Sequence, residues 1–321
     1  MPRSNIQYRG RFAPSPTGPL HLGSLIDALA SFLDARHSTG SWLVRMEDLD
    51  LPREEPGAAD SILHSLQCHG LHWDENILYQ STRTSAYAAA LTHLADRGNL
   101  FLCDCTRAIL STSGACQGNC RTSQTKISGP AAVRISVPCE QDILFTDRLQ
   151  GPEHTLLGQS LQDFVVKRKD KLYAYQLAVV VDDAEQGITH VVRGSDLLDS
   201  TPRQIFLQQR LDYPTPRYCH LPVITTGQGQ KFSKQNHACL LYTADAADEL
   251  LSLILGGHLR KQKNNKKLMP TLKRWYWMTM MLTQIWAMMC LMTTTMTPFL
   301  LTKSPMSLQT TTIAKFLRLA R

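Results

Sequence analysis

The residues with the clearest chemical potential lie near the N-terminus, in the run RFAPSPTGPLHLGS at residues 11–24. A strand candidate ends in a turn rich in Pro and Gly, and a helix candidate begins close to His21 and Gly23. The first turn of a helix has backbone N–H groups without intrahelical partners, and such groups bind phosphate. His21 adds a donor for phosphate oxygens on which charge accumulates. The run therefore predicts a nucleotide site, although Pro/Gly turns before helices are also common without any chemical role.

A second candidate segment for nucleotide binding is KFSKQ at residues 231–235, which follows Gly227 and Gly229. Two lysines on either side of a serine, in a loop with glycine hinges, suit a mobile cationic clamp on a polyphosphate. A solvated basic loop has the same composition, so this motif is weak by itself. The two motifs together are a stronger indication than either one alone.

Four of the nine cysteines have the spacing of metal ligands: Cys103, Cys105, Cys116 and Cys120. This spacing suits a closed, tetrahedral zinc site of four cysteines with a structural role, and the alternative is four reduced thiols that bind no metal. The N-terminal run MPRSNIQYRGR contains no apolar stretch of the kind found in secretory signals. We therefore expect a reducing, cytoplasmic location, where clustered cysteines indicate a metal site and not a disulfide framework.

The elements that must position these groups alternate between strand-like and helix-like patterns over the first 100 residues. Such alternation predicts an α/β fold with a doubly wound parallel sheet. We expect strands at residues 9–13 and 42–46, and helices at residues 22–35, 58–71 and 84–95. Further apolar, β-rich runs are at residues 131–137, 175–181 and 187–192.

Charge is distributed unevenly along the chain, which has 34 Lys+Arg, 27 Asp+Glu and a formal net charge of +7. Residues 251–321 contain 11 Lys+Arg and no acid, so residues 1–250 carry a net charge of −4. At 43% hydrophobic and 19% charged residues, the composition excludes disordered and fibrous chains. Any affinity of the first 250 residues for nucleic acid must come from local basic patches such as residues 167–171.

The C-terminal segment allows three interpretations. Residues 275–302 carry no charge and are long enough for a membrane anchor, but Gln284, Pro298 and residues 293–295 weaken their hydropathy. The run RKQKNNKK at residues 260–267 suits a tail that binds nucleic acid. We favour the third interpretation, a divergent or out-of-frame tail, because missing acids and an excess of Met and Thr are atypical of a folded surface.

Together, the two nucleotide motifs resemble the signatures of class I aminoacyl-tRNA synthetases, usually written His-Ile-Gly-His and Lys-Met-Ser-Lys-Ser. The run at residues 11–24 is similar to the glutamate-specific branch. Within that branch, the short chain, the Cys cluster and KFSKQNHA resemble the glutamyl-Q tRNA(Asp) synthetase family, a shortened glutamyl-tRNA synthetase paralogue without an anticodon-binding domain. The other matching segments are WLVRMEDLD (42–50), YAYQLAVVVDD (173–183), HVVRGSDLLDSTPRQ (190–204) and YCHLPVI (218–224).

The resemblance implies a Rossmann-like core that activates L-glutamate with ATP to glutamyl-adenylate and transfers the glutamate to the queuosine base of tRNA(Asp). ATP, with magnesium, is then a substrate, and zinc is the structural cofactor. Ser24 stands where the first signature has its second His, and it can still donate one hydrogen bond. The implied catalytic residues are His21, Ser24, Lys231 and Lys234, and the implied ATP-binding residues are His21, Gly23, Ser24 and Lys234.

L-Glutamate has two carboxylates and one ammonium group, so its pocket needs two cations and one acid. At the matching motif positions the chain has Arg11, Arg193 and Glu47, with Tyr175 as a hydroxyl donor. Which arginine binds which carboxylate stays open, and an alternative role for Glu47 is a strand-end ion pair with Arg45. The full set implied for glutamate binding is Arg11, Phe12, Ala13, Pro14, Ser15, Glu47, Tyr175 and Arg193.

The implied metal site departs from the family pattern, which contains three Cys and one Tyr. Cys116 stands at the Tyr position, and the spacer is one residue shorter. Because a thiolate binds zinc better than a phenol does, this change favours the zinc interpretation.

We expect four parts along the chain. Residues 1–100 form the first half of the nucleotide-binding core, and residues 101–192 form an insertion with the Cys cluster and the acceptor-binding region. Residues 193–255 form the second half of the core with the KFSKQ loop, and residues 256–321 form a basic tail rich in Met and Thr, a short helical or irregular region.

Two alternatives to this function remain open. The first is a glutamyl-tRNA synthetase-like enzyme that charges a tRNA 3′ end, which the missing anticodon-binding domain disfavours. The second is an inactive paralogue that binds tRNA, which the presence of His21, Lys234 and both pocket arginines disfavours. The expected partners are L-glutamate, ATP and tRNA(Asp) carrying queuosine, with no membrane, and we expect a monomer.

Overall fold

A computed structural model of the chain describes residues 7–223 except 107, 111–113, 117–118, 123–126, 128 and 140–141. The KFSKQ loop, with Lys231 and Lys234, and the uncharged stretch at 275–302 therefore lie outside the described residues. The contact pattern divides the chain into Met1–Lys266 and Lys267–Arg321, and every described residue belongs to the first unit. No helix among the described residues is long and apolar enough to cross a membrane.

Parallel strands form the centre of the fold. β1 pairs with β2, and β2 pairs with the short β3, while β9 pairs with β10. The backbone N–H of Thr189 donates to the carbonyl of Arg9 at 2.9 Å, so β9 lies beside β1. From β1 the chain builds the sheet in one direction, through β2 to β3. From β9 it builds the sheet in the other direction, to β10. The strands are β1 (Arg9–Phe12), β2 (Ser41–Met46), β3 (Leu78–Tyr79), β9 (His190–Gly194) and β10 (Arg217–Leu221).

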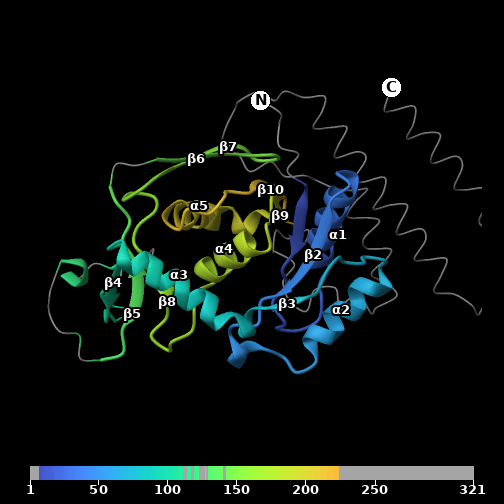
Figure 1. Cartoon of the computed structure of the whole chain (residues 1–321). Helices are drawn as coiled ribbons and strands as arrows, with labels where there is room; N and C mark the ends of the chain where they lie inside the picture. The colour runs from blue at the N-terminus through green and yellow to red at the C-terminus, as the bar shows by residue number, and fades with distance from the viewer. Residues whose placement is uncertain are drawn as a thin grey trace, which may run out of the picture. The chain divides into compact units, whose positions relative to one another are not determined.

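Helices cover both faces of these strands, as expected for a doubly wound α/β fold (Figure 1). Trp42 of β2 points toward α1, where its indole Nε1–H donates to Ser31 Oγ at 2.9 Å. The next residue, Leu43, faces the opposite side and joins a core made by α3, α4 and α5. The α-helices are α1 (Leu22–His37), α2 (Ala58–Cys68), α3 (Thr84–Asp96), α4 (Tyr175–Glu185) and α5 (Thr201–Arg210). Short 3-10 helices are at Leu51–Arg53, Gln80–Arg83, Asn119–Arg121 and Ser195–Ser200.

The expected strands at 9–13 and 42–46 and the expected helices at 22–35 and 84–95 are confirmed to within two residues at each end. The prediction of a β-rich run at residues 175–181 is wrong, because these residues belong to α4. Every residue from Leu177 to Val181 is at most 4% exposed. A run that is buried on all sides has no periodicity to separate strand from helix. Here packing against α3 and α5 overrides the β preference of three consecutive valines.

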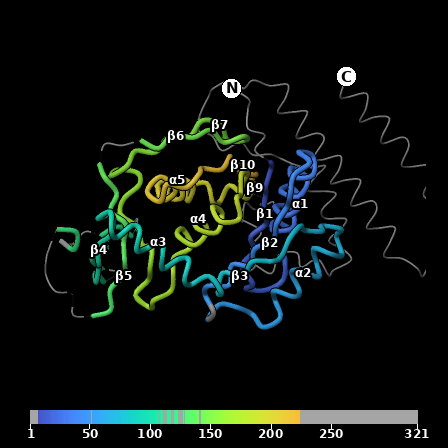
Figure 2. Tube along the Cα trace, in the orientation of Figure 1, coloured from blue at the N-terminus to red at the C-terminus, as the bar shows by residue number. Residues whose placement is uncertain are grey.

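A mostly antiparallel region is inserted between α3 and α4. β5 pairs with both β4 and β8, and β6 and β7 form a separate hairpin. Figures 1 and 2 show this hairpin returning from the β4–β5 region so that its tip approaches β10. The strands are β4 (Leu100–Cys103), β5 (Ala132–Ile135), β6 (Asp142–Asp147), β7 (Gly151–Leu156) and β8 (Phe164–Lys167).

Candidate active site at the switch point of the sheet

The connections on either side of the β1/β9 boundary run in opposite directions, so this boundary is the topological switch point of the parallel strands. Ligands of open α/β sheets bind outside the carboxyl ends of the strands at such a point. Arg11 lies near the end of β1, and Arg193 lies near the end of β9. Glu47 directly follows β2, and Tyr175 begins α4. The four charged or hydroxyl-bearing residues expected to bind glutamate therefore come from four elements that meet here.

One acid, Asp183 of α4, holds two buried arginines. Its Oδ1 accepts from Arg11 Nε at 3.2 Å and lies 2.8 Å from a terminal nitrogen of Arg45. Burial acts to raise the pKa of Asp183, but the two guanidinium groups hold that pKa below its ordinary value. The carboxylate of Asp183 is therefore paired with Arg11 and Arg45, and it is not available as a base toward a substrate.

Arg193 is buried, with 5% of its surface exposed, but it is held by neutral groups. Its Nε donates to His220 Nε2 at 3.0 Å and a terminal nitrogen donates to Thr201 Oγ1 at 2.9 Å. The other terminal nitrogen is 3.5 Å from the hydroxyl of Tyr175. Among the described residues, no carboxylate forms an ion pair with Arg193. Since a buried charge without a counter-charge is costly, this guanidinium is suited to bind an anion.

Glu47 is the other acid of the cluster, with a side chain only 11% exposed. Its Oε1 lies 4.0 Å from the nearest nitrogen of Arg45, at the limit of an ion pair, and Arg45 is closer to Asp183. The alternative role of Glu47 as a partner of Arg45 is therefore present only in a weak form. Burial raises the pKa of Glu47 to about 7, although Arg45 and Arg11 act in the opposite direction. A carboxyl with this pKa is ready to ionise when a cation, such as an ammonium group, approaches.

The turn before α1 places His21 and Ser24 at the helix N-terminus. His21 is the N-cap, and its Nδ1 accepts the backbone N–H of Ser24 at 3.2 Å. The neutral ring therefore carries its proton on Nε2, which is 3.0 Å from Ser24 Oγ. Gly18 allows the preceding turn because its φ of 126° is costly for any residue with a Cβ. With Gly23 in the first helical turn, the backbone N–H groups of α1 are arranged to bind a phosphate.

The remaining residues of the expected glutamate set line the turn between β1 and α1. Phe12 stacks on Trp42 with ring centroids 6.4 Å apart, so its side chain belongs to the core. The carbonyl of Pro14 accepts the backbone N–H of Glu47 at 2.9 Å, and this bond ties the turn to β2. Ala13 is half-buried and Ser15 is exposed. Their roles toward a ligand stay predictions, as do those of Lys231 and Lys234 outside the described residues.

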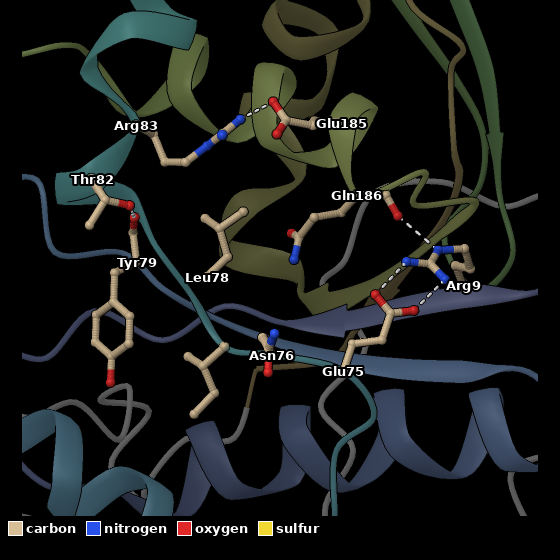
Figure 3. Close-up of a pocket in the computed structure, with 10 residues that line it drawn as sticks. Arg9, Glu75, Asn76, Leu78, Tyr79, Thr82, Arg83, Glu185 and Gln186 are labelled. Atoms are coloured by element: carbon tan, nitrogen blue, oxygen red, sulfur yellow. Dashed lines mark hydrogen bonds and ion pairs between the residues drawn. The ribbon is translucent and has the colours of Figure 1, made fainter.

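One pocket among the described residues lies away from this cluster, along β3. It has a volume of about 810 Å³ and is open to solvent. Figure 3 shows residues that line it. Arg9 at one end binds Glu75 through two hydrogen bonds of 2.7 and 3.0 Å, and Arg83 at the other end pairs with Glu185. Both arginines are therefore neutralised by acids. The pocket has no unpaired charge comparable to that of Arg193, and we do not assign the chemistry to it.

The four clustered cysteines converge in space. Their Sγ atoms all lie within 4.8 Å of one another, and Cys105 Sγ is 3.6 Å from Cys116 Sγ and 3.4 Å from Cys120 Sγ. Four thiolates around a metal at about 2.3 Å would be separated by about 3.8 Å, so the donor set fits a tetrahedral ion. Lys169 Nζ donates to the carbonyls of Asp104 and Cys105 at 2.7 and 2.9 Å, which anchors this site to the loop after β8. The Cys cluster could thus bind one metal ion.

We predict one tightly bound metal ion per chain, lost when Cys105 is replaced by Ser. Cys105 is buried and its Sγ lies 3.6 Å from Cys116 Sγ and 3.4 Å from Cys120 Sγ. A serine hydroxyl is a much poorer ligand than a thiolate. The measurement is elemental analysis of the purified protein after dialysis. The matched control is Cys139→Ser, because Cys139 is an exposed free cysteine outside the cluster. Equal metal content in the two variants would contradict this assignment.

Three residues of the cluster were not identified from the sequence: Asp183, Thr201 and His220. Arg45 was considered only as an alternative partner of Glu47. The partners of these residues are distant along the chain: Arg11 and Asp183 are separated by 172 positions. One signal for Asp183 was available in the sequence, namely the pair Asp182–Asp183 at the end of the apolar run YAYQLAVVVDD. Carboxylates that directly follow a buried run need buried partners, and cations are the strongest of these.

Comparisons with known proteins show which family the chain belongs to. The family of class I tRNA synthetases (E and Q), catalytic domain, matches residues 7–261. A glutamyl-Q tRNA(Asp) synthetase of Thiobacillus denitrificans is 55% identical over 236 residues, which cover 71% of this chain and 78% of the relative. One from Pseudomonas putida is 51% identical over 249 residues, covering 77% and 82%.

Among solved structures, the glutamate-tRNA synthetase of Elizabethkingia anophelis is similar, with a TM-score of 0.64 and 27% identity. The match covers 72% of this chain and 53% of that enzyme, so the chain spans about half the length of that synthetase. The sequence resemblance is therefore confirmed at the level of sequence and fold. The chain belongs to the glutamyl-Q tRNA(Asp) synthetase family, and it is a ligase of the aminoacyl-tRNA synthetase type.

Proposed function

We propose that this protein activates L-glutamate with ATP to glutamyl-adenylate and transfers the glutamate to the queuosine base of tRNA(Asp). The names of its relatives support this assignment. The observation that carries it is the charge of the buried cluster. The cluster contains three arginines (Arg11, Arg45 and Arg193) and two acids (Asp183 and Glu47). Its net charge is therefore positive whether or not Glu47 is ionised. L-Glutamate, with two carboxylates and one ammonium group, complements this set.

In this proposal, Arg193 and Arg11 bind the two carboxylates of glutamate, and Glu47 binds its ammonium group. The Tyr175 hydroxyl, already 3.5 Å from Arg193, is available for a further hydrogen bond to the same carboxylate. The side chain of glutamine ends in a neutral amide, so glutamine would leave the arginine that binds the side-chain carboxylate without a counter-charge. An unpaired buried charge is the strongest penalty a pocket can apply to an analogue of the same shape.

For the first step, we propose that the phosphates of ATP lie at the N-terminus of α1. There His21 Nε2–H would turn from Ser24 Oγ to a phosphate oxygen. The α-carboxylate of glutamate attacks the α-phosphorus, the bond to the bridging oxygen breaks, and pyrophosphate leaves. Lys231 and Lys234 would neutralise the leaving group, and magnesium would accompany ATP. The protein supplies position and charge, and no covalent enzyme intermediate is needed.

We propose zinc as the metal of the Cys cluster, because four thiolates without an open position are typical of structural zinc. The ion would brace the region between β4 and β5, where Lys169 also binds. Its role would be to hold the insertion that contacts tRNA. We further propose that the protein acts as a monomer in the cytoplasm.

The similarity to the Elizabethkingia glutamate-tRNA synthetase favours a second candidate function, the charging of a tRNA 3′ end. Both enzymes would form the same adenylate, so the amino-acid site does not separate them. The acceptor does: one reaction requires queuosine and the other does not.

We predict glutamate-dependent exchange of pyrophosphate into ATP in the absence of tRNA. Lys234→Ala should lower the exchange rate by about 100-fold or more, because it removes a positive charge from the leaving group. No exchange by the wild-type protein would leave only a tRNA-binding paralogue. With tRNA(Asp) added, transfer of labelled glutamate should require queuosine. Equal transfer to tRNA(Asp) with and without queuosine would instead favour 3′-end charging.

We also predict that kcat/KM for glutamate falls as the pH drops below about 7. The pKa of Glu47 in the free enzyme is raised to about 7, chiefly by burial, so the carboxylate that binds the ammonium is lost below this pH. The decline should approach tenfold per pH unit in exchange assays at saturating ATP. Glu47→Gln should lower kcat/KM at pH 8 and make the profile flat in this range. A wild-type decline centred near the ordinary carboxyl pKa of about 4.3 would contradict the role of Glu47.

A further inference from the structure

The tip of the β6–β7 hairpin is connected to Arg193 by an unbroken chain of buried hydrogen bonds. Asp147, at the end of β6, is 1% exposed, and its Oδ2 lies 2.7 Å from His220 Nδ1. The opposite nitrogen of the same imidazole, Nε2, is 3.0 Å from Arg193 Nε. His220 itself is fully buried. The insertion, β10 and the end of β9 therefore meet in one row of side chains.

The chemistry of the row fixes the proton on His220. Burial works to raise the pKa of Asp147, but hydrogen bonds, foremost that from His220, bring it to about 2, so the carboxylate can only accept. His220 Nδ1 must then carry a proton and donate it. Burial lowers the pKa of His220, which leaves the ring neutral and Nε2 with a free lone pair. That lone pair accepts the Nε–H of Arg193, and Thr201 Oγ1 lies 3.1 Å from the same nitrogen.

Because the acceptor for Arg193 Nε–H is a neutral imidazole and not a carboxylate, Arg193 keeps its positive charge. Arg193 is oriented through its Nε by an imidazole and through a terminal nitrogen by the Thr201 hydroxyl. Neither group cancels its charge, so the guanidinium is fixed in place and still without an ion pair to any described acid. The imidazole of His220 separates the negative charge of Asp147 from Arg193. Four further N–H···O contacts, from the backbone of Leu149, Gln150 and His220, stabilise the Asp147 carboxylate.

We propose that Asp147 and His220 are positioning residues for Arg193, and that the hairpin tip thereby sets the affinity of the enzyme for glutamate. Asp147 selects the imidazole tautomer, His220 presents Nε2 as an acceptor, and Arg193 is held in the orientation that receives a carboxylate. This positioning role rests on the proposed glutamate-binding role of Arg193. It adds two residues, one of them from the insertion, that do not touch the substrate.

Asp147→Asn tests the tautomer. Oδ1 of Asp147 accepts backbone N–H groups from Leu149 and Gln150 at 2.9 and 2.8 Å, so the amide oxygen of the new side chain should occupy this position. Its NH2 group then replaces Oδ2, so it no longer accepts the backbone N–H of His220 and instead faces His220 Nδ1. The ring proton moves to Nε2, where it opposes Arg193 Nε–H. We expect KM for glutamate to rise by about tenfold or more, the loss typical of a hydrogen bond to a charged group. KM for ATP should not change.

Two substitutions of His220 separate its two contacts. His220→Asn keeps a donor for Asp147 but does not reach Arg193, so KM for glutamate should rise as in Asp147→Asn. His220→Gln can place its amide oxygen near the Nε2 position and accept from Arg193, so KM should stay within about threefold of wild type.

The matched control is Arg148→Met at the same hairpin tip. Arg148 binds Asp34 of α1 at 2.6 Å, so this variant loosens the tip without touching the imidazole. KM values for glutamate and ATP come from pyrophosphate exchange, and thermal unfolding checks each variant.

An unchanged glutamate KM in Asp147→Asn would overturn the inference, as would an equal rise in Arg148→Met, which would indicate general loosening. If His220→Asn does not fold, the comparison of Asp147→Asn with Arg148→Met decides. Absence of glutamate-dependent exchange in the wild type would instead defeat the proposed function.

Discussion

A buried excess of positive charge is the constraint on which the rest of this structure depends. Arg11, Arg45 and Arg193 approach the carboxyl ends of the central strands, and only Asp183 is fully committed to neutralise them. Burying a charge without a partner costs several kcal/mol, so each of these guanidinium groups needs a defined environment. α4 provides Asp183 for two of them. The third is held by neutral groups and keeps its charge for a ligand.

The fold supplies these environments from segments that are far apart along the chain. The strand order places β1 and β9 side by side at the switch point, which brings Arg11 and Arg193 to one crevice. The hairpin of the insertion reaches back to β10 and fixes His220. The insertion that carries the Cys cluster thus also contributes to the candidate site for which we propose glutamate binding. The same arrangement leaves the N-terminus of α1, with His21, beside the turn that follows β1.

Much of this could be predicted from the sequence, where the signal is local. The periodicity of residues 22–35 predicts α1, and the Cys spacing predicts the cluster that the structure brings within 4.8 Å. Motif positions predict Arg11, Glu47, Tyr175 and Arg193, which the structure brings together. Residues 175–181 could not be assigned correctly, because complete burial removes the periodicity. Asp183 and His220 were missed because their roles depend on partners in other elements, and a single sequence carries no record of such pairings.

The retained positive charge of the buried cluster is tested most directly by calorimetric titration of the wild-type protein. The ligands are L-glutamate and L-glutamine, each in the presence of a non-hydrolysable ATP analogue. The two ligands have nearly the same shape and differ in the charge of one terminal group. We expect glutamate to bind at least about 100-fold more tightly, since glutamine leaves a buried guanidinium unpaired. Equal affinity for the two amino acids would show that the buried cluster does not hold its charge for the substrate.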